Sequence, residues 1–180
     1  MIALRKKTEF PFNIKQESEI WCIPATIQAV TRYCVDMDVP QKWIWERWVA
    51  ACCEEKIDPL TIWFGSIKKL VLDREKQFTS WAEAEASTSL PNFTAVCDKI
   101  KDSLVADVPP IVSTPVFYNG IHTGWHMLCV IAYNNNALEV HDPNPLVPAE
   151  ARSYPTAQLK SDLKMANSRA THLLLLNRRP

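Results

Sequence analysis

Three consecutive asparagines, Asn134–Asn136, separate two apolar runs and are typical of a β-hairpin turn. The two runs are Trp125–Tyr133 and Ala137–His141. In an antiparallel hairpin with this turn, position 126 lies opposite positions 142 to 144. Because side chains alternate along a strand, His126 and Asp142 are expected on one face of the hairpin and His141 on the other. The turn therefore predicts that an imidazole and a carboxylate meet across two strands.

Helical patterns dominate before this hairpin, and strand patterns dominate from about residue 106 onward. The order predicts an α+β fold in which a helical half (about 16–105) packs on a mostly antiparallel sheet half (about 106–180). Helices are expected from Pro24 to near Asp36–Pro40 and at Gln41–Cys52, 60–72, 92–104 and Thr156–Lys164. Further strands are expected at Ile2–Leu4, 76–80, Ile111–Phe117 and Thr171–Asn177, with a surface segment at 81–90 and a Pro-rich loop at 143–155.

Length and composition set the broad class of protein. The chain of 180 residues suggests one domain, and its 20 basic and 20 acidic residues cancel, so no global field favours nucleic acid or an anionic membrane. Only 3 glycines argue against a glycine-rich phosphate cradle, and no cofactor is predicted. Signal-peptide and membrane-spanning patterns are absent from the sequence. We expect a cytoplasmic protein with reduced thiols, and secretion without a cleaved signal stays open.

Cys22 precedes the apolar pattern of the first predicted helix. A thiol at a helix N-terminus faces unpaired N–H groups and the positive end of the macrodipole, and both favour the thiolate. A cysteine nucleophile also needs a base held by an orienting group, and the hairpin supplies His126 and Asp142. The sequence therefore predicts a Cys22–His126–Asp142 triad, whereas a lone cysteine would be interpreted as a packing residue.

Two other interpretations of the cysteines and histidines stay open. A disulfide between Cys34 and Cys52 or Cys53 would need an oxidising destination. His122 and His126 have a spacing that could bind a metal, but no carboxylate or cysteine completes a ligand set nearby, so no metal is predicted. Because Gly124 is expected to break regular structure, His122 is predicted in a loop near the site, as a second candidate for the base.

The residues that carry this chemistry resemble a known family. Gln16, Cys22, His126 and Asp142 are similar to the oxyanion-hole glutamine, nucleophile, base and orienting residue of papain-like cysteine peptidases. The segments Trp21-Cys22-Ile23-Pro24-Ala25, Trp125-His126-Met127 and Val140-His141-Asp142-Pro143 look nearest to two branches of that family. These are the double-glycine leader peptidases of bacterial exporters and papain-like bacterial effectors or toxins. The resemblance implies a papain-like fold and thiol acyl chemistry on an amide.

The expected function is that of a cysteine hydrolase, a peptidase acting on a protein or peptide substrate. Trp21 and Trp125 are expected to flank the nucleophile, with His122 nearby. An effector or toxin with an immunity or secretion partner fits the resemblance. A glutamine deamidase or a transglutaminase-type acyltransferase would use the same thioester, and a non-catalytic binding module would keep only the fold.

Overall fold

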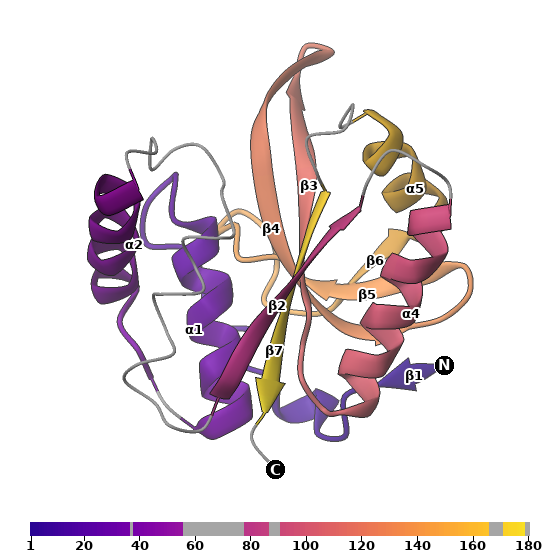
Figure 1. Ribbon diagram of the computed structural model, residues 1–180, viewed down its shortest axis with the longest axis horizontal. Helices are drawn as coiled ribbons and strands as arrows, with labels where there is room; N and C mark the ends of the chain where they lie inside the picture. The colour runs from indigo at the N-terminus through magenta and orange to yellow at the C-terminus, as the bar shows by residue number, and fades with distance from the viewer. Residues whose placement is uncertain (37, 56–77, 87–90, 166–170, 179–180) are drawn as a thin grey trace.

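One antiparallel sheet forms the centre of the molecule. The computed structural model describes residues 1–36, 38–55, 78–86, 91–165 and 171–178 (Figure 1). Six strands of these residues pair in the order β2-β7-β3-β4-β5-β6, and a seventh, β1, pairs with the C-terminal end of β4. The strands are β1 (Ile2–Ala3), β2 (Phe78–Ala86), β3 (Ile111–Tyr118), β4 (Ile121–Tyr133), β5 (Ala137–His141), β6 (Arg152–Pro155) and β7 (Thr171–Arg178).

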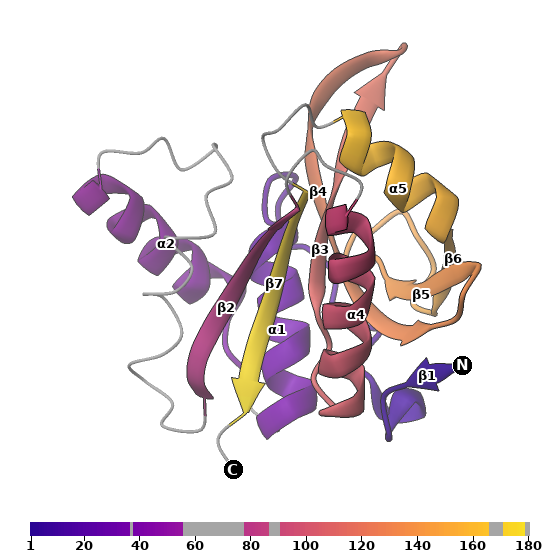
Figure 2. The same ribbon diagram turned by 45° about the vertical axis from the view of Figure 1, so that its right-hand side comes forward.

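Helices lie on both sides of the central strands. In two views, α1 (Cys22–Val35) and α2 (Gln41–Glu55) are on one side of β3 and β4, and α4 (Pro91–Val105) and α5 (Thr156–Met165) are on the other (Figures 1 and 2). A short 3-10 helix, η1 (Lys7–Glu9), follows β1. Within the described ranges, no helix has the length and apolar character that crossing a membrane requires. The architecture confirms the predicted α+β fold.

Helix α1 is the most deeply embedded element. Ile27, Val30 and Cys34, which recur at helical spacing, are buried, and so is nearly all of the rest of the helix. The Cys129 thiol of β4 donates to the Thr26 carbonyl oxygen at 3.6 Å, so the helix packs directly on the central strand. The helix ends at Asp36, whose φ of 53° stops the right-handed turn. Its N-terminal end is therefore held in a fixed position.

The β4–β5 hairpin forms as the asparagine turn predicted. Asn134 N–H donates to the Ala137 carbonyl at 2.9 Å, and the Asn134 side chain accepts from the N–H groups of Asn136 and Ala137. Cys129 pairs with His141, so the same register places position 126 opposite 144, within the predicted range. A bulge near the turn changes the register only beyond Val130.

Three parts of the sheet differ from the prediction. Strand β2 runs to Ala86, because its alternating Trp81–Ala86 segment pairs with β7, and this pairing outweighs the poor strand propensity of Ala and Glu. Strand β6 lies inside the expected 143–155 loop and pairs with β5. Strand β4 starts four residues early, because a bulge accommodates Thr123 where a break was expected at Gly124. The predicted helix at 60–72 lies outside the described residues.

Candidate active site

Cys22 is the first residue of α1 and is 8% exposed. The preceding residue, Trp21, makes no side-chain capping hydrogen bond, and Pro24 in the first turn has no N–H. Ala25 N–H is paired with the Trp21 carbonyl at 3.0 Å. The N–H groups of Cys22 and Ile23 are left at the positive end of the helix, where they can donate to an anion that forms beside the thiol.

His126 of β4 lies between Cys22 and Asp142. Its Nε2 is 2.7 Å from Oδ1 of Asp142, the residue directly after β5. The His126 side chain also forms a hydrogen bond with the Cys22 thiol, and since Nε2 is engaged by the carboxylate, Nδ1 is the nitrogen left for the sulfur. The side chains of His126 and Asp142 are 20% and 8% exposed. The structure thus brings together three residues from α1, β4 and the end of β5.

The hydrogen bond between His126 and Asp142 stabilises the charged form of each side chain. Burial by itself lowers the pKa of His126, but its hydrogen bonds to Asp142 and Cys22 outweigh burial and raise the pKa to about 9. Burial raises the pKa of Asp142, while the hydrogen bond to His126 and the charge of Arg152 hold it below its usual value. At neutral pH the cluster therefore contains an imidazolium beside a carboxylate, and the imidazolium can donate a proton.

Arg152 is a site residue that the sequence did not reveal. Its Nη1 donates to Oδ2 of Asp142 at 2.6 Å, while Oδ1 accepts from His126 and from the backbone N–H of Asn144 at 2.9 Å. Arg152 is the first residue of β6, and its pairing with Val140 of β5 places the guanidinium near Asp142. Because β6 was expected to be loop, no register was available that would have placed an arginine next to the carboxylate. Arg152 orients Asp142 without touching the thiol.

Replacing Arg152 with glutamine is expected to lower kcat about 10-fold with little change in KM, because a carboxylate that rotates holds the imidazole less well. Arg152→Lys should recover part of the loss, since it restores a charge without the planar guanidinium. Arg32→Gln is a matched control: Arg32 is exposed to a similar degree and pairs with Asp36 at 3.5 Å, away from the thiol. Equal kcat values in the Arg152 and Arg32 variants would contradict the orienting role.

Gln16 lies beside the segment that follows Asp142. Its backbone N–H donates to the Pro143 carbonyl at 2.8 Å. Its side-chain Nε2, however, donates to the carbonyl groups of Ser18 and Glu19 at 3.1 and 3.0 Å, and its buried Oε1 has no partner. The predicted oxyanion role of Gln16 therefore requires that one of these two hydrogen bonds be exchanged for the substrate oxygen.

The buried side chain of Gln41, at the start of α2, holds the loop that carries Gln16. Gln41 Oε1 accepts from the Glu17 N–H at 3.0 Å, and its Nε2 donates to the Lys15 carbonyl at 2.6 Å. The residues before and after Gln16 are thus fixed by one amide. Lys15 adds a second tie, because its Nζ donates to the carbonyl oxygens of Asp142 and Pro148 at 2.8 and 3.1 Å.

The three predicted substrate-contact residues lie in two places, Trp21 just before α1 and Trp125 and His122 in β4. Trp21 is next to Cys22, and its ring centroid is 6.1 Å from that of Trp45 on α2. Trp125 alternates with His126 along a regular part of β4, so its side chain emerges on the opposite face of the strand. His122 lies in β4 opposite Phe117, which corrects its predicted position in a loop. His126 is the histidine that contacts Cys22 and Asp142.

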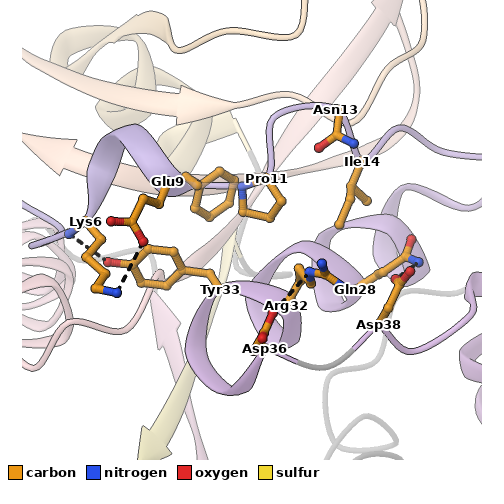
Figure 3. A pocket seen from close by; sticks show the side chains of 11 residues that line it. Lys6, Glu9, Pro11, Asn13, Ile14, Gln28, Arg32, Tyr33, Asp36 and Asp38 are labelled. Carbon is orange, nitrogen blue, oxygen red and sulfur yellow. Dashed lines mark hydrogen bonds and ion pairs between the residues drawn. The ribbon is translucent and has the colours of Figure 1, made fainter.

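A hollow of about 700 Å³ lies at some distance along α1 from these residues (Figure 3). It is bounded by the segment after β1 and by the C-terminal half of α1, with ion pairs between Lys6 and Glu9 and between Arg32 and Asp36 at its rim. Its lining includes none of Gln16, Cys22, His126 and Asp142. The charged side chains around it already have partners, since Lys6 pairs with Glu9, Arg32 with Asp36, and Asp38 accepts from the Gln28 amide, so the hollow presents no unpaired charge to a ligand.

The metal and disulfide interpretations concern histidine and cysteine side chains that the structure describes only in part. No group of three or more His, Cys, Asp and Glu side chains in that part of the chain could hold a metal ion. Cys34 and Cys53, two of the residues considered for a disulfide, are not joined in one. The side chain of Cys52 lies outside the described set.

The fold is similar to that of C39-type peptidase domains of known structure. The peptidase domain of Streptococcus ComA, described as a bifunctional ABC transporter in a quorum sensing pathway, matches with a TM-score of 0.54 and 15% identity, covering 99% of this chain and 100% of that one. A putative C39-like peptidase from Bacillus anthracis matches with a TM-score of 0.65 and 11% identity, covering 99% and 98%. No family model and no curated protein matches the sequence.

Proposed function

We propose that the protein is a cysteine peptidase that hydrolyses a peptide bond through a thioester on Cys22. The observation that carries the proposal is the position of His126, whose ring is hydrogen bonded to the Cys22 thiol and, through Nε2, to Asp142 at 2.7 Å. These contacts match the requirements for an activated thiol: a nucleophile, a base within hydrogen-bond reach, and a group that orients the base. The C39-type fold supports the same activity.

The proposed reaction follows from the positions of these groups. Cys22 attacks the carbonyl carbon as a thiolate, with its proton held by His126, and the oxygen that becomes negative is stabilised by the Cys22 N–H and, after its side chain turns, by Gln16. The His126 imidazolium gives its proton to the leaving amine as the C–N bond breaks. Neutral His126 then removes a proton from water, whose oxygen attacks the thioester. The C–S bond breaks, the acid is released, and the Cys22 thiolate and the His126 imidazolium are restored. Asp142, fixed by Arg152, keeps the imidazole in the orientation that both steps need.

Mass spectrometry of a reduced, unfolded casein after incubation with the protein tests this proposal. We expect cleaved backbone, whereas a gain of about one mass unit at glutamine would indicate a deamidase and an added amine an acyltransferase. Iodoacetamide should modify Cys22 faster than the exposed free thiol of Cys53, because only Cys22 has an imidazolium partner. Modification of Cys22 no faster than Cys53, together with intact casein, would favour a binding module. Delivery as an effector or toxin, its immunity or secretion partners and the cellular location stay predictions.

A further inference from the structure

Strands β3 and β4 continue beyond the body of the protein as a two-stranded arm. The side chains of β3 are buried from Ile111 to Thr114, and those of Val116, Phe117 and Tyr118 are exposed. Figure 1 shows the arm rising past the ends of the neighbouring helices. An isolated pair of strands gains little stability in water by itself, so an arm of this kind is expected to have another role.

One face of the arm is apolar and is shared with His126. Thr114 pairs directly with His126, and alternation along β3 places Val116 and Tyr118 on the same face. Ile121 is opposite Tyr118 and joins them. Val116, Tyr118 and Ile121 are 40%, 71% and 69% exposed. An exposed apolar cluster of this kind marks an interaction surface more often than single surface residues do.

Gly124 leaves the surface open between His126 and the apolar cluster. It pairs with Val116, and a Cβ atom added at Gly124 would meet no atom within 4 Å apart from those of its chain neighbours. The strand geometry also sets the scale: at about 3.3 Å per residue, roughly 16 Å of β4 separates His126 from Ile121. A peptide whose bond is being attacked at Cys22 can cover this interval with about five extended residues.

The arm has no acidic side chain and no lysine or arginine that could pair with a charged ligand, so it favours an uncharged one. The sequence from Ile111 to Tyr133 contains no Asp, Glu, Lys or Arg. Exposed strand edges are usually protected by charged residues, and β4 has none, although in the described chain β5 pairs with it only from Cys129 onward. An extended apolar peptide can therefore pair with the outer part of this edge, where Ile121 and Thr123 are exposed.

We propose that the hairpin face formed by Val116, Tyr118 and Ile121 binds apolar side chains of the substrate next to the bond that Cys22 attacks. This inference rests on the proposed function and names its substrate class: a peptide segment with aliphatic or aromatic residues beside the scissile bond. The substrate is favoured over a second copy of the chain because the apolar face, the open position at Gly124 and His126 form one continuous surface.

The test compares two peptides that carry a Michael acceptor in place of the central peptide bond, flanked on both sides by leucine or by serine. The wild-type protein should react at Cys22 at least 10-fold faster with the leucine peptide. In the combined variant Val116→Thr, Tyr118→Thr and Ile121→Thr this preference should disappear, because threonine keeps strand propensity but removes apolar surface. Val105→Thr, at a 63% exposed position at the end of α4, is the matched control and should keep the preference.

Iodoacetamide separates this inference from the proposed function. It is too small to reach the arm, so its rate at Cys22 should be the same in the wild type and in the threonine variants. If Cys22 reacts with iodoacetamide no faster than Cys53, both ideas are overturned. If iodoacetamide reacts as expected but the leucine preference is absent, or persists in the combined variant, the docking surface alone is wrong. A wild-type dimer that the combined variant converts to a monomer, with the preference unchanged, would assign the surface to a second copy.

Discussion

Replacement of Cys22 by alanine is expected to reduce peptide hydrolysis about 10⁴- to 10⁶-fold, because no other group at the site can form the thioester. The substitution removes only a sulfur atom from an 8% exposed side chain, so the thermal unfolding midpoint should change little. The initial rate of cleavage and the unfolding midpoint are measured together. Cys53→Ala, which removes an exposed free thiol from α2, is the control and should cleave at the wild-type rate.

The same experiment can show whether Cys22 and His126 act as a unit. Groups that cooperate in one step have strongly non-additive effects when they are removed. The double variant Cys22→Ala, His126→Ala is therefore expected to be no slower than Cys22→Ala. Cleavage by Cys22→Ala at more than a tenth of the wild-type rate would show that the reaction does not depend on this thiol.

Replacing Asp142 with asparagine should lower kcat about 10²-fold, because the amide lacks the negative charge that stabilises the His126 imidazolium. The pH dependence should change as well. In the wild type, hydrolysis is expected to fall as the pH rises through about 9, where His126 loses the proton that the leaving amine needs. Without the Asp142 carboxylate, the pKa of His126 falls, and the alkaline decline should begin at lower pH.

Two observations check this prediction. The pH–rate profile of Asp142→Asn should have its alkaline limb below that of the wild type, and an NMR titration of the His126 ring should shift in the same direction. Asp98→Asn is a suitable control, since Asp98 is an exposed residue of α4 that pairs with Lys101. An unchanged alkaline limb in Asp142→Asn would show that the carboxylate does not set the proton affinity of His126.

Local patterns were sufficient to predict the parts of the site that depend on one strand register. The asparagine turn determines how β4 pairs with β5, and alternation then places His126 and Asp142 on one face. The start of α1 was also predictable within two residues, because Pro24 and the apolar spacing mark the first turn. These features depend on residues close together in sequence.

Contacts between distant segments were not predictable. Arg152 reaches Asp142 because β6 pairs with β5, yet the Arg152–Pro155 segment looks like a Pro-rich loop. The two N–H groups of the Gln16 amide donate within its own loop, which no spacing rule reveals. The long β3–β4 arm was missed because Gly124 was interpreted as a break, whereas the bulge at Thr123 lets the strands continue.

The wide sequence separation of the site residues has a consequence during protein synthesis. The hydrogen bond from Lys15 to the Asp142 carbonyl joins positions 127 residues apart, and Arg152 follows later still. At about 5–20 residues per second, a ribosome would make the Cys22 segment several seconds or more before the base and the acid. During that interval the thiol has no imidazole to activate it. The order of the chain therefore implies a period of latency, in which the proposed nucleophile is made first and the groups proposed to activate it are made more than a hundred residues later.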